Sequence, residues 1–271
     1  MITINVNPVL FSVGRLSVRW YGLMYVVGIT IGLLVAWPYA KWKGITDDQM
    51  EKIVIWAVPA GLVGARLYYV VQQPLGPYLS NPGRIFAVWE GGMAFYGAIF
   101  GVVITILLLA RRYKISIPNL LDVAAIFAVV GQFFGRIGNI INGDILGFPT
   151  KLPWGFIYAN PNSFAPRNDI AYQPAAVYEA LINILLFGLL WWQRKKLKPG
   201  VLFFIYILGY SLSQIIVFFW RDNEVLFLGL KQAQLTAIGT IIVAVVVFVW
   251  FFRRQKAAHA KLEQQQNQTG T

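Results

Sequence analysis

The chain has 271 residues, of which 58% are hydrophobic and only 13% charged, and its mean hydropathy is +0.60. Because about a quarter of the residues in a soluble domain are charged, this composition excludes a water-soluble globular protein and, equally, a disordered chain. The formal net charge of +12 does not indicate nucleic-acid binding, because the basic residues cluster at the ends of apolar blocks. With no cysteine, the chain has no disulfide, thiolate metal site or cysteine nucleophile of its own.

Seven apolar blocks are long enough to cross a bilayer, which takes about 20 residues each. We therefore expect an all-α, polytopic integral membrane protein with seven transmembrane helices. The expected spans are Trp20–Ala40, Ile53–Gln73, Gly92–Ala110, Leu121–Asn142, Pro174–Trp192, Val201–Trp220 and Lys231–Phe252.

The basic residues predict the orientation of these spans. Fourteen lie in the segments that follow the odd-numbered spans, and seven lie on the opposite side. By the positive-inside rule, the N-terminus faces out and the C-terminus is cytoplasmic. We expect one membrane domain over residues 1–252 and a polar cytoplasmic tail over residues 253–271 that frays into disorder. The single histidine, His259, lies in that tail without a partner cluster and is expected to be solvated.

The segments outside the spans differ in length. The first 19 residues have neither the signature of a signal peptide nor a helical pattern, and we place them at the outer surface. Two outer loops, residues 74–91 and 143–173, are longer than a helix connection needs and contain several prolines, glycines and aromatic residues. These loops predict a folded cap at the outer membrane interface.

The fourth span has one strongly polar face. At about 100° per residue, a helix places Gln132, Arg136, Asn139 and Asn142 on one side together with three glycines, and phenylalanine and isoleucine residues on the other. An arginine inside a span costs about 2.5–3.5 kcal/mol on insertion scales, so it normally has a partner or faces a wet cavity.

Two interpretations of Arg136 follow. It forms a buried ion pair with Asp122 or Glu179, or it holds a lipid phosphate while the neighbouring amides bind phosphate or glycerol oxygens. We favour the phosphate, because packing alone does not require two adjacent asparagines. A second arginine inside a span, Arg66, either belongs to the same site or pairs with Glu90 or extends to the interface.

Five segments resemble one known family, the phosphatidylglycerol–prolipoprotein diacylglyceryl transferases. The resemblance extends from about Ser17 to Phe252, in the same order and with the same seven-span layout. Its most specific part is the Gly-Arg-Ile-Gly-Asn-x-x-Asn-Gly run of the fourth span. The matching segments are Arg19–Tyr25, Gly64–Leu67, Gly91–Gly97, Gly135–Asp144 and Tyr178–Leu181.

The resemblance implies an enzyme of the bacterial inner (plasma) membrane. This enzyme moves the diacylglyceryl group of phosphatidylglycerol to the lipobox cysteine in the signal peptide of a prolipoprotein and releases glycerol 1-phosphate. It also implies that Arg136 binds phosphatidylglycerol beside Asn139 and Asn142, that Tyr21 is the essential first-span tyrosine, and that Asp144 stands for a family glutamate. The expected partners are these two substrates and the bilayer, without nucleic acid. No metal or organic cofactor is expected.

Three family positions are changed. Tyr96 follows the third-span glycines where the family usually has histidine, and Gln214 and Phe218 replace an arginine and a glutamate one turn apart. The joint replacement removes a salt bridge without leaving an orphan charge, so restoring the arginine alone should bury an unpaired cation. Gln214 remains a candidate substrate contact and Tyr96 a candidate catalytic residue.

The lost arginine leaves two roles to assign. Arg66 or Arg221 is expected to replace it at the phosphate, although Arg221 also fits an anchor at the membrane surface. For deprotonating the thiol, the candidates are Tyr96, Asp144 and Glu179, and arginine proximity alone can raise the thiolate fraction.

Two other functions compete with the transferase. A catalytically weakened homologue would bind anionic lipid or prolipoprotein without forming product. A transporter or channel would also place polar faces inside a bundle, but the chain has no convincing internal repeat and no acidic relay within its spans.

Overall fold

The computed structural model describes residues 1–14, 16–87 and 91–269, and gives the backbone alone at Leu16, Phe95 and residues 255–269. The chain divides into two compact units: unit 1 comprises Met1–Val35 and Ala124–Thr271, and unit 2 comprises Ala36–Val123. Arg15, counted above on the outer side, and Glu90, the expected alternative partner of Arg66, lie outside the described residues.

A helix coincides with each of the seven expected spans. Five of them are long and apolar enough to cross a membrane, namely α1, α2, α5, α6 and the Gln232–Arg254 part of α8, whereas α7 is shorter. The protein is therefore a mostly helical membrane protein. The helices are α1 (Trp20–Trp42), α2 (Asp47–Gln72), α4 (Phe95–Arg112), α5 (Ile117–Asn142), α6 (Ala175–Gln193), α7 (Val201–Val217) and α8 (Gln232–Thr269).

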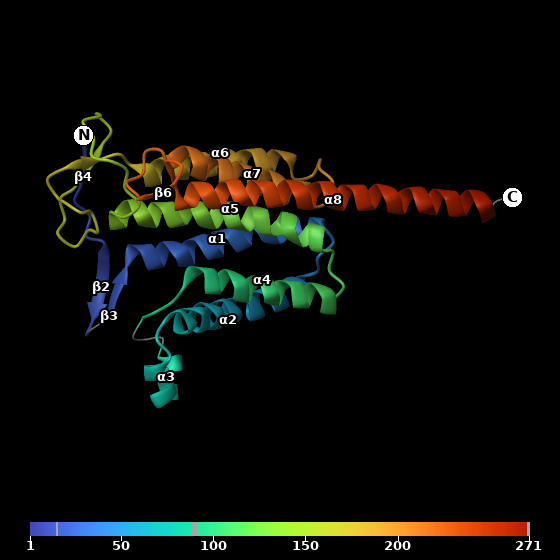
Figure 1. Cartoon of the computed structure of the whole chain (residues 1–271), viewed down its shortest axis with the longest axis horizontal. Coiled ribbons are helices and arrows are strands. Elements are labelled where there is room, and N and C mark those ends of the chain that lie inside the picture. The colour runs from blue at the N-terminus through green and yellow to red at the C-terminus, as the bar shows by residue number, and fades with distance from the viewer. Residues whose placement is uncertain (15, 88–90, 270–271) are drawn as a thin grey trace. The chain divides into compact units, whose positions relative to one another are not determined.

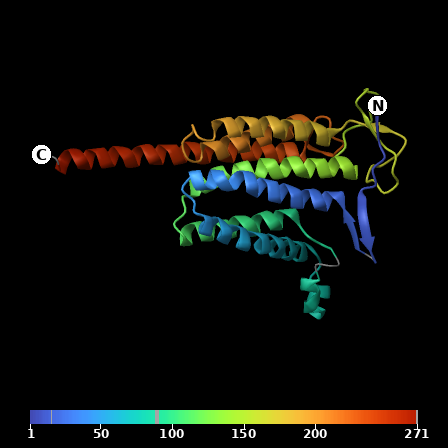
Figure 2. The ribbon, with the colours of Figure 1, turned by 180° about the vertical axis from the view of Figure 1, so that it is seen from behind.

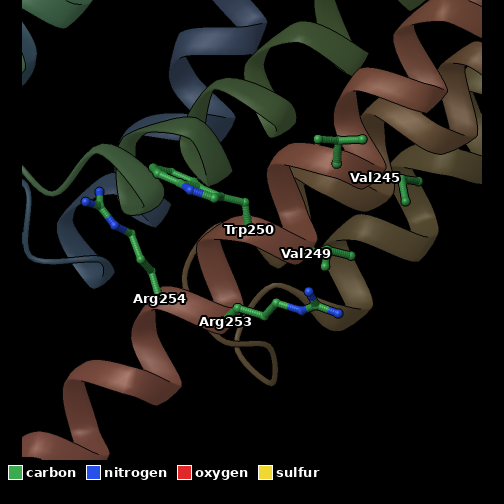
Figure 3. Close-up of a pocket in the computed structure, with 6 residues that line it drawn as sticks. Val245, Val249, Trp250, Arg253 and Arg254 are labelled. Atoms are coloured by element: carbon green, nitrogen blue, oxygen red, sulfur yellow. The ribbon is translucent and has the colours of Figure 1, made fainter.

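The expected end of the last helix near Phe252 is wrong, because α8 continues to Thr269. The sequence beyond Phe252 is rich in alanine, glutamine, lysine and arginine, which are strong helix formers and extend a helix that is already nucleated. Figure 3 shows where the apolar part of α8 stops: Val245, Val249 and Trp250 are followed within one turn by Arg253 and Arg254. The Arg254 guanidinium lies 4.8 Å from the Trp250 ring centroid, an aromatic and cationic boundary typical of a membrane surface.

Unit 1 contains short strands that the hydrophobic pattern does not predict. The N-terminal residues are not helical, as expected, but form β1 (Ile2–Ile4), which pairs in parallel with β4 (Phe156–Tyr158); β4 pairs antiparallel with β5 (Ala171–Tyr172). The N-terminus and the long loop after α5 therefore share one small sheet. Two further strand pairs are β2 (Val9–Val13) with β3 (Leu16–Arg19), and β6 (Val225–Phe227) with β7 (Leu230–Lys231).

The helices of unit 1 lie side by side, as both ribbon views show for α5, α6, α7 and α8 (Figures 1 and 2). Glycines bring α1 close to α5: a Cβ on Gly28 would lie 3.0 Å from the Phe134 Cβ, and a Cβ on Gly32 would lie 2.9 Å from the Phe127 ring. Small residues at such positions let helix backbones approach in a bilayer, where lipid competes equally well for apolar side chains.

Unit 2 is built on a closer helix pair, α2 with α4. A Cβ on Gly64 would lie 2.4 Å from the carbonyl oxygen of Gly97, and a Cβ on Gly101 would lie 2.2 Å from that of Ala60. No side chain fits there, so the two backbones are in direct contact. The α2–α4 connection contains α3 (Gly76–Ser80) and the 3₁₀-helix η1 (Pro82–Phe86).

The acidic residue of α5 in unit 2 has its own partner. Lys43 Nζ lies 2.8 Å from Asp122 Oδ2, both side chains are buried, and Asn119 donates to the Lys43 carbonyl. The suggested pairing of Asp122 with Arg136 is therefore wrong. Helix geometry alone excludes that pairing, because 14 residues at 1.5 Å each place Asp122 and Arg136 about 21 Å apart along one helix. The partner Lys43 could not be identified from the sequence, because it lies in a connection far from Asp122 along the chain.

Candidate active site

The polar face of α5 ends in a chain of hydrogen bonds. Gly143, with φ +76°, ends the helix in the left-handed conformation that favours glycine, and directs the following residue, Asp144, back toward the helix. Arg136 Nη1 donates to Asn139 Oδ1 at 3.1 Å, and Asn139 Nδ2 donates to Asp144 Oδ1 at 3.0 Å. The helical spacing predicted that Arg136 and Asn139 share a face, and they do.

Glu179, on α6, is the centre of the cluster. Its Oε2 lies 2.7 Å from Arg136 Nη2 and accepts from Gln214 Nε2 at 3.0 Å, and its Oε1 lies 3.7 Å from Arg221 Nη1. The Glu179 side chain is 1% exposed, whereas those of Arg136 and Arg221 are 17% and 15% exposed. The ion-pair interpretation with Glu179 is thus correct, and the arginine side of the pair stays accessible.

One buried carboxylate therefore serves two guanidiniums. Within the part of the chain that the structure describes, the Nε–H groups of Arg136 and Arg221 are buried and have no acceptor. Unpaired buried donors are costly, and guanidiniums bind phosphate well because their N–H groups match its oxygens. The cluster has spare positive charge and spare donors, which is the chemistry of an anion-binding site.

Tyr21 lies against the glycine face of α5. A Cβ on Gly138 would lie 3.0 Å from the Tyr21 ring and 3.1 Å from its Cα. The Tyr21 hydroxyl lies 2.9 Å from the Tyr25 hydroxyl. The Tyr21 hydroxyl is also close enough to Arg136 and Asp144 to interact electrostatically with both. Tyr21 thus belongs to the same cluster.

Asn142, at the end of α5, is held by an arginine that sequence reasoning did not single out. Arg19 Nη1 donates to Asn142 Oδ1 at 2.9 Å and to the Asn162 carbonyl at 3.3 Å, while its guanidinium lies 3.9 Å from the Phe164 ring centroid. Asn142 therefore anchors the end of α5 to the loop beyond it. The signal available was the position of Arg19 directly before Trp20 and Tyr21.

The backbone after α7, which carries Arg221, is held by residues that were also missed. Lys231 Nζ donates to the carbonyls of Phe218, at 2.7 Å, and Arg221, and Gln234 Nε2 donates to the Ile215 carbonyl at 3.0 Å. These buried donors satisfy carbonyls that the end of a helix leaves without partners. No local sequence signal could have identified Lys231, because the expected role of a lysine at a span end is surface anchoring.

The loop after α5 completes this support. Phe148 N donates to the Trp220 carbonyl at 2.9 Å, and Gly147 N donates to the Gln173 carbonyl at 2.9 Å. A Cβ on Gly147 would lie 2.4 Å from the Trp220 carbonyl oxygen, so only glycine fits. Arg221 is positioned by contacts on both sides of its backbone.

Gln214, on α7, contacts a residue of the neighbouring helix α6. Its Nε2 donates to the Glu179 carboxylate, which Arg136 and Arg221 already share, so the expectation about an arginine restored at this position stays a prediction. The ring of Phe218 supports the Arg221 guanidinium, with 4.5 Å from Cζ to the ring centroid. The sequence did not reveal the contact of Gln214 with Glu179, because Glu179 lies on α6 and the sequence argument considered α7 alone.

Arg66 is a buried loop anchor in unit 2. It donates from Nε to the Ile85 carbonyl at 2.8 Å, from Nη1 to those of Gly91 and Gly92 at 2.6 and 3.1 Å, and from Nη2 to that of Arg84 at 2.6 Å. These bonds account for the arginine inside α2 by stabilising the connection to α4.

Tyr96 also lies in unit 2, in the first turn of α4, and is 53% exposed. Arg66 and Tyr96 both belong to unit 2, whereas the charged cluster belongs to unit 1. That cluster comprises Arg19, Tyr21, Arg136, Asn139, Asn142, Asp144, Glu179, Gln214 and Arg221.

These features define a class of protein: a polytopic membrane protein with a basic, amide-lined cluster near the ends of its helices. Comparison with known proteins gives the family. The family model described as prolipoprotein diacylglyceryl transferase matches residues 8–250. The chain belongs to this family and is a transferase.

Curated relatives named phosphatidylglycerol–prolipoprotein diacylglyceryl transferase cover most of the chain. The protein from Rhizobium meliloti (strain 1021) is 34% identical over 275 residues, which cover 94% of each chain. That from Synechococcus elongatus is 36% identical over 254 residues, covering 91% of this chain and 88% of the relative. The Geobacter sulfurreducens protein is 36% identical over 224 residues, 81% of this chain and 84% of the relative.

Proposed function

We propose that this protein transfers the diacylglyceryl group of phosphatidylglycerol to the thiol of a prolipoprotein lipobox cysteine and releases glycerol 1-phosphate. The observation that carries the proposal is the cluster in which Arg136 and Arg221 share the carboxylate of Glu179 and retain buried Nε–H groups that have no acceptor among the described residues. The phosphate of an anionic lipid supplies both the charge and the acceptors.

In the proposed reaction, negative charge develops on the leaving phosphate, which the cluster binds. The thiolate sulfur forms a bond to C3 of the glycerol while the bond from C3 to the phosphate oxygen breaks, so the leaving phosphate becomes a monoester that tends toward the dianion. Fixed cations aimed at the growing charge stabilise the transition state. We assign this role to Arg136 and Arg221, with Asn139 orienting Arg136 and Gln214 orienting the carboxylate.

The thiol proton must pass to an acceptor. Glu179 is neutralised by the guanidiniums of Arg136 and Arg221, whereas the hydrogen bond that the described residues give Asp144 comes from the neutral amide of Asn139. We therefore assign the proton to Asp144 and place Tyr21 beside it. The catalytic role of Tyr96 and the substrate contact of Asn142 stay predictions, whereas the contacts of Arg66 with backbone carbonyls support a role as loop anchor in place of the predicted substrate contact.

We further propose the topology of the protein: seven spans, with the N-terminus outside and the C-terminus in the cytoplasm of a bacterial cell. Residues 1–252 form the membrane domain, with a cap built at the outer face from the loops and the β1-β4-β5 sheet, and residues 253–271 form the tail. The bias of basic residues toward one side supports this orientation. Phosphatidylglycerol then enters sideways from the outer leaflet.

The test is transfer of radiolabelled lipid to a lipobox peptide by membranes that contain the protein. We expect product from the wild type, and a loss of at least a hundredfold in Arg136→Ala. The matched control is Arg167→Ala, which removes an exposed arginine paired with Asp169 at 2.6 Å and should leave transfer unchanged. A well-folded wild type that binds phosphatidylglycerol but forms no product would favour the non-catalytic homologue.

A further inference from the structure

The β6–β7 hairpin, which connects α7 to α8, has an apolar tip formed by residues 225–228. The side chains of Val225, Leu226 and Phe227 are at least 60% exposed, and that of Leu228 is 82% exposed. Because successive side chains of a strand point to opposite sides, those of β6 cover both faces of the hairpin. A contiguous apolar surface of this kind outside the helices indicates contact with another apolar surface.

The turn of the hairpin disfavours a leucine. Leu228 and Gly229 connect β6 to β7 with φ +49° and +75°, so both adopt the left-handed conformation of a type I′ turn. Asparagine or aspartate followed by glycine is the usual choice there, because larger side chains are strained at positive φ. Leu228 is therefore unfavourable in water for two reasons, its backbone conformation and its exposed side chain. Burial of the side chain in an apolar phase offsets both.

The apolar tip is continuous with a surface that lipid covers. α7 ends at Val217 and α8 begins at Gln232, and Figure 1 shows β6 beside the start of α8. Ile216, Phe219 and Trp220 are exposed at the same end of α7. Aromatic residues at the end of a membrane helix are typical of the boundary between lipid and water. The hairpin thus leaves the helices at the level of this boundary.

The hairpin changes from polar to apolar along its length. Its base contains Asp222, Asn223 and Glu224, which are exposed and polar, whereas the tip is apolar on both faces. A groove on a protein partner covers one face of a strand and leaves the other in solvent, but a bilayer surrounds an inserted tip on all sides. A polar base and an apolar tip also match the change from lipid headgroups to acyl chains.

We propose that the tip of the β6–β7 hairpin inserts into the leaflet that faces this end of unit 1 and thereby fixes the depth of Arg221 in the bilayer. Arg221 lies at the base of the hairpin, and its backbone carbonyl accepts a hydrogen bond from Lys231 Nζ at the start of α8. The hairpin is therefore closed directly at the residue that carries the guanidinium. Insertion is a contact with lipid acyl chains and does not require that the protein transfer a diacylglyceryl group.

The absence of cysteine from the chain permits a depth measurement on the whole protein. Leu228→Cys is labelled with a nitrobenzoxadiazole fluorophore and reconstituted in phosphatidylcholine vesicles whose acyl chains carry a spin label either near the headgroup or near the chain end. We expect the fluorophore to lie about 5–10 Å into the boundary between headgroups and acyl chains, the depth of interfacial segments, and to be protected from iodide in the water. Asn223→Cys, at the polar base of the same hairpin, is the matched control, and its label should be quenched by iodide.

A second variant removes the apolar side chain without straining the turn. Asparagine adopts the left-handed conformation more readily than leucine, so Leu228→Asn should keep the hairpin folded. With the fluorophore placed at Leu226→Cys, the added Leu228→Asn change should move the label toward the water and raise its quenching by iodide. An unchanged depth of this label would overturn the role of Leu228 in insertion.

Three results of the first measurement would overturn the proposal as a whole. Equal quenching by iodide at positions 228 and 223 would place the tip in water. Protection from iodide without quenching by the lipid spin labels would show that protein, such as a second copy of this chain, covers the tip. Protection that appears only after addition of an apolar signal peptide would show that the tip binds a peptide and not the bilayer.

Discussion

Replacing Glu179 with glutamine should destabilise the protein strongly in the absence of anionic lipid. The change keeps the size of the side chain but removes the negative charge that Arg136 and Arg221 share at 2.7 and 3.7 Å. Because the carboxylate is almost fully buried, the loss leaves uncompensated cations, for which about 3–5 kcal/mol is typical. In a chain of this size, that corresponds to a fall of about 10 °C in unfolding temperature.

The matched control is Asp48→Asn, the same chemical change in an exposed pair. Asp48 Oδ2 lies 2.6 Å from Lys52 Nζ, but its side chain is 68% exposed, and such pairs are worth about 0–1 kcal/mol. Unfolding is followed by intrinsic fluorescence in a zwitterionic detergent, with and without phosphatidylglycerol. The lipid phosphate should restore more than half of the lost stability in Glu179→Gln, whereas phosphatidylcholine at the same concentration should restore less.

Equal unfolding temperatures for Glu179→Gln and Asp48→Asn in lipid-free detergent would refute the reasoning. They would mean that the shared carboxylate does not compensate the arginines. Restoration by phosphatidylcholine as well as by phosphatidylglycerol would show that headgroup charge is not what the cluster recognises.

Three further outcomes follow from the contacts around the site. Lys231→Met should lower transfer about tenfold, because it removes the donor that holds the Arg221 carbonyl, while Lys231→Arg should recover part of the rate; equal rates for both variants would exclude this positioning role. Gly147→Ala should abolish transfer or folding, because the methyl group would lie 2.4 Å from the Trp220 carbonyl oxygen, and wild-type transfer by this variant would contradict the packing. Burial raises the pKa of Tyr158, so the folded state favours the neutral phenol. The contribution of this group to stability is therefore full below the unfolded-state pKa of about 10 and falls as the pH rises above that value. Tyr158→Phe should weaken the fall in unfolding temperature between about pH 9 and 11, and an unchanged profile would exclude Tyr158 as the source of that fall.

The parts of the structure that depend on local periodicity were predictable. A period of 3.6 residues placed Arg136 and Asn139 on one face of a helix, and the need to compensate a buried cation left Glu179 as one of two possible partners. The apolar blocks predicted the positions of the seven helices by their length, because about 20 apolar residues cross a bilayer. Helix geometry also excludes Asp122, which lies about 21 Å from Arg136 along one helix and so leaves Glu179 as the partner.

The remaining features depend on contacts between distant parts of the chain. The four backbone carbonyls around Arg66, the placement of Lys231 beneath Arg221 and the contact of Gln214 with Glu179 have no signature in the residues that flank them. Each becomes visible only when two elements pack. The family resemblance identified Gln214 as important but indicated a lost charge pair, whereas its amide still contacts the carboxylate.

The pairing of β1 with β4 has a consequence for how the protein is made. Ile2 aligns with Phe156, so β1 stays unpaired until the later loop that contains Phe156 has been synthesised. Insertion of the early helices therefore precedes closure of this small sheet, and the N-terminal segment must remain accessible to the later loop throughout. A bulky fusion at the N-terminus should delay that closing step, whereas one at the C-terminus should not.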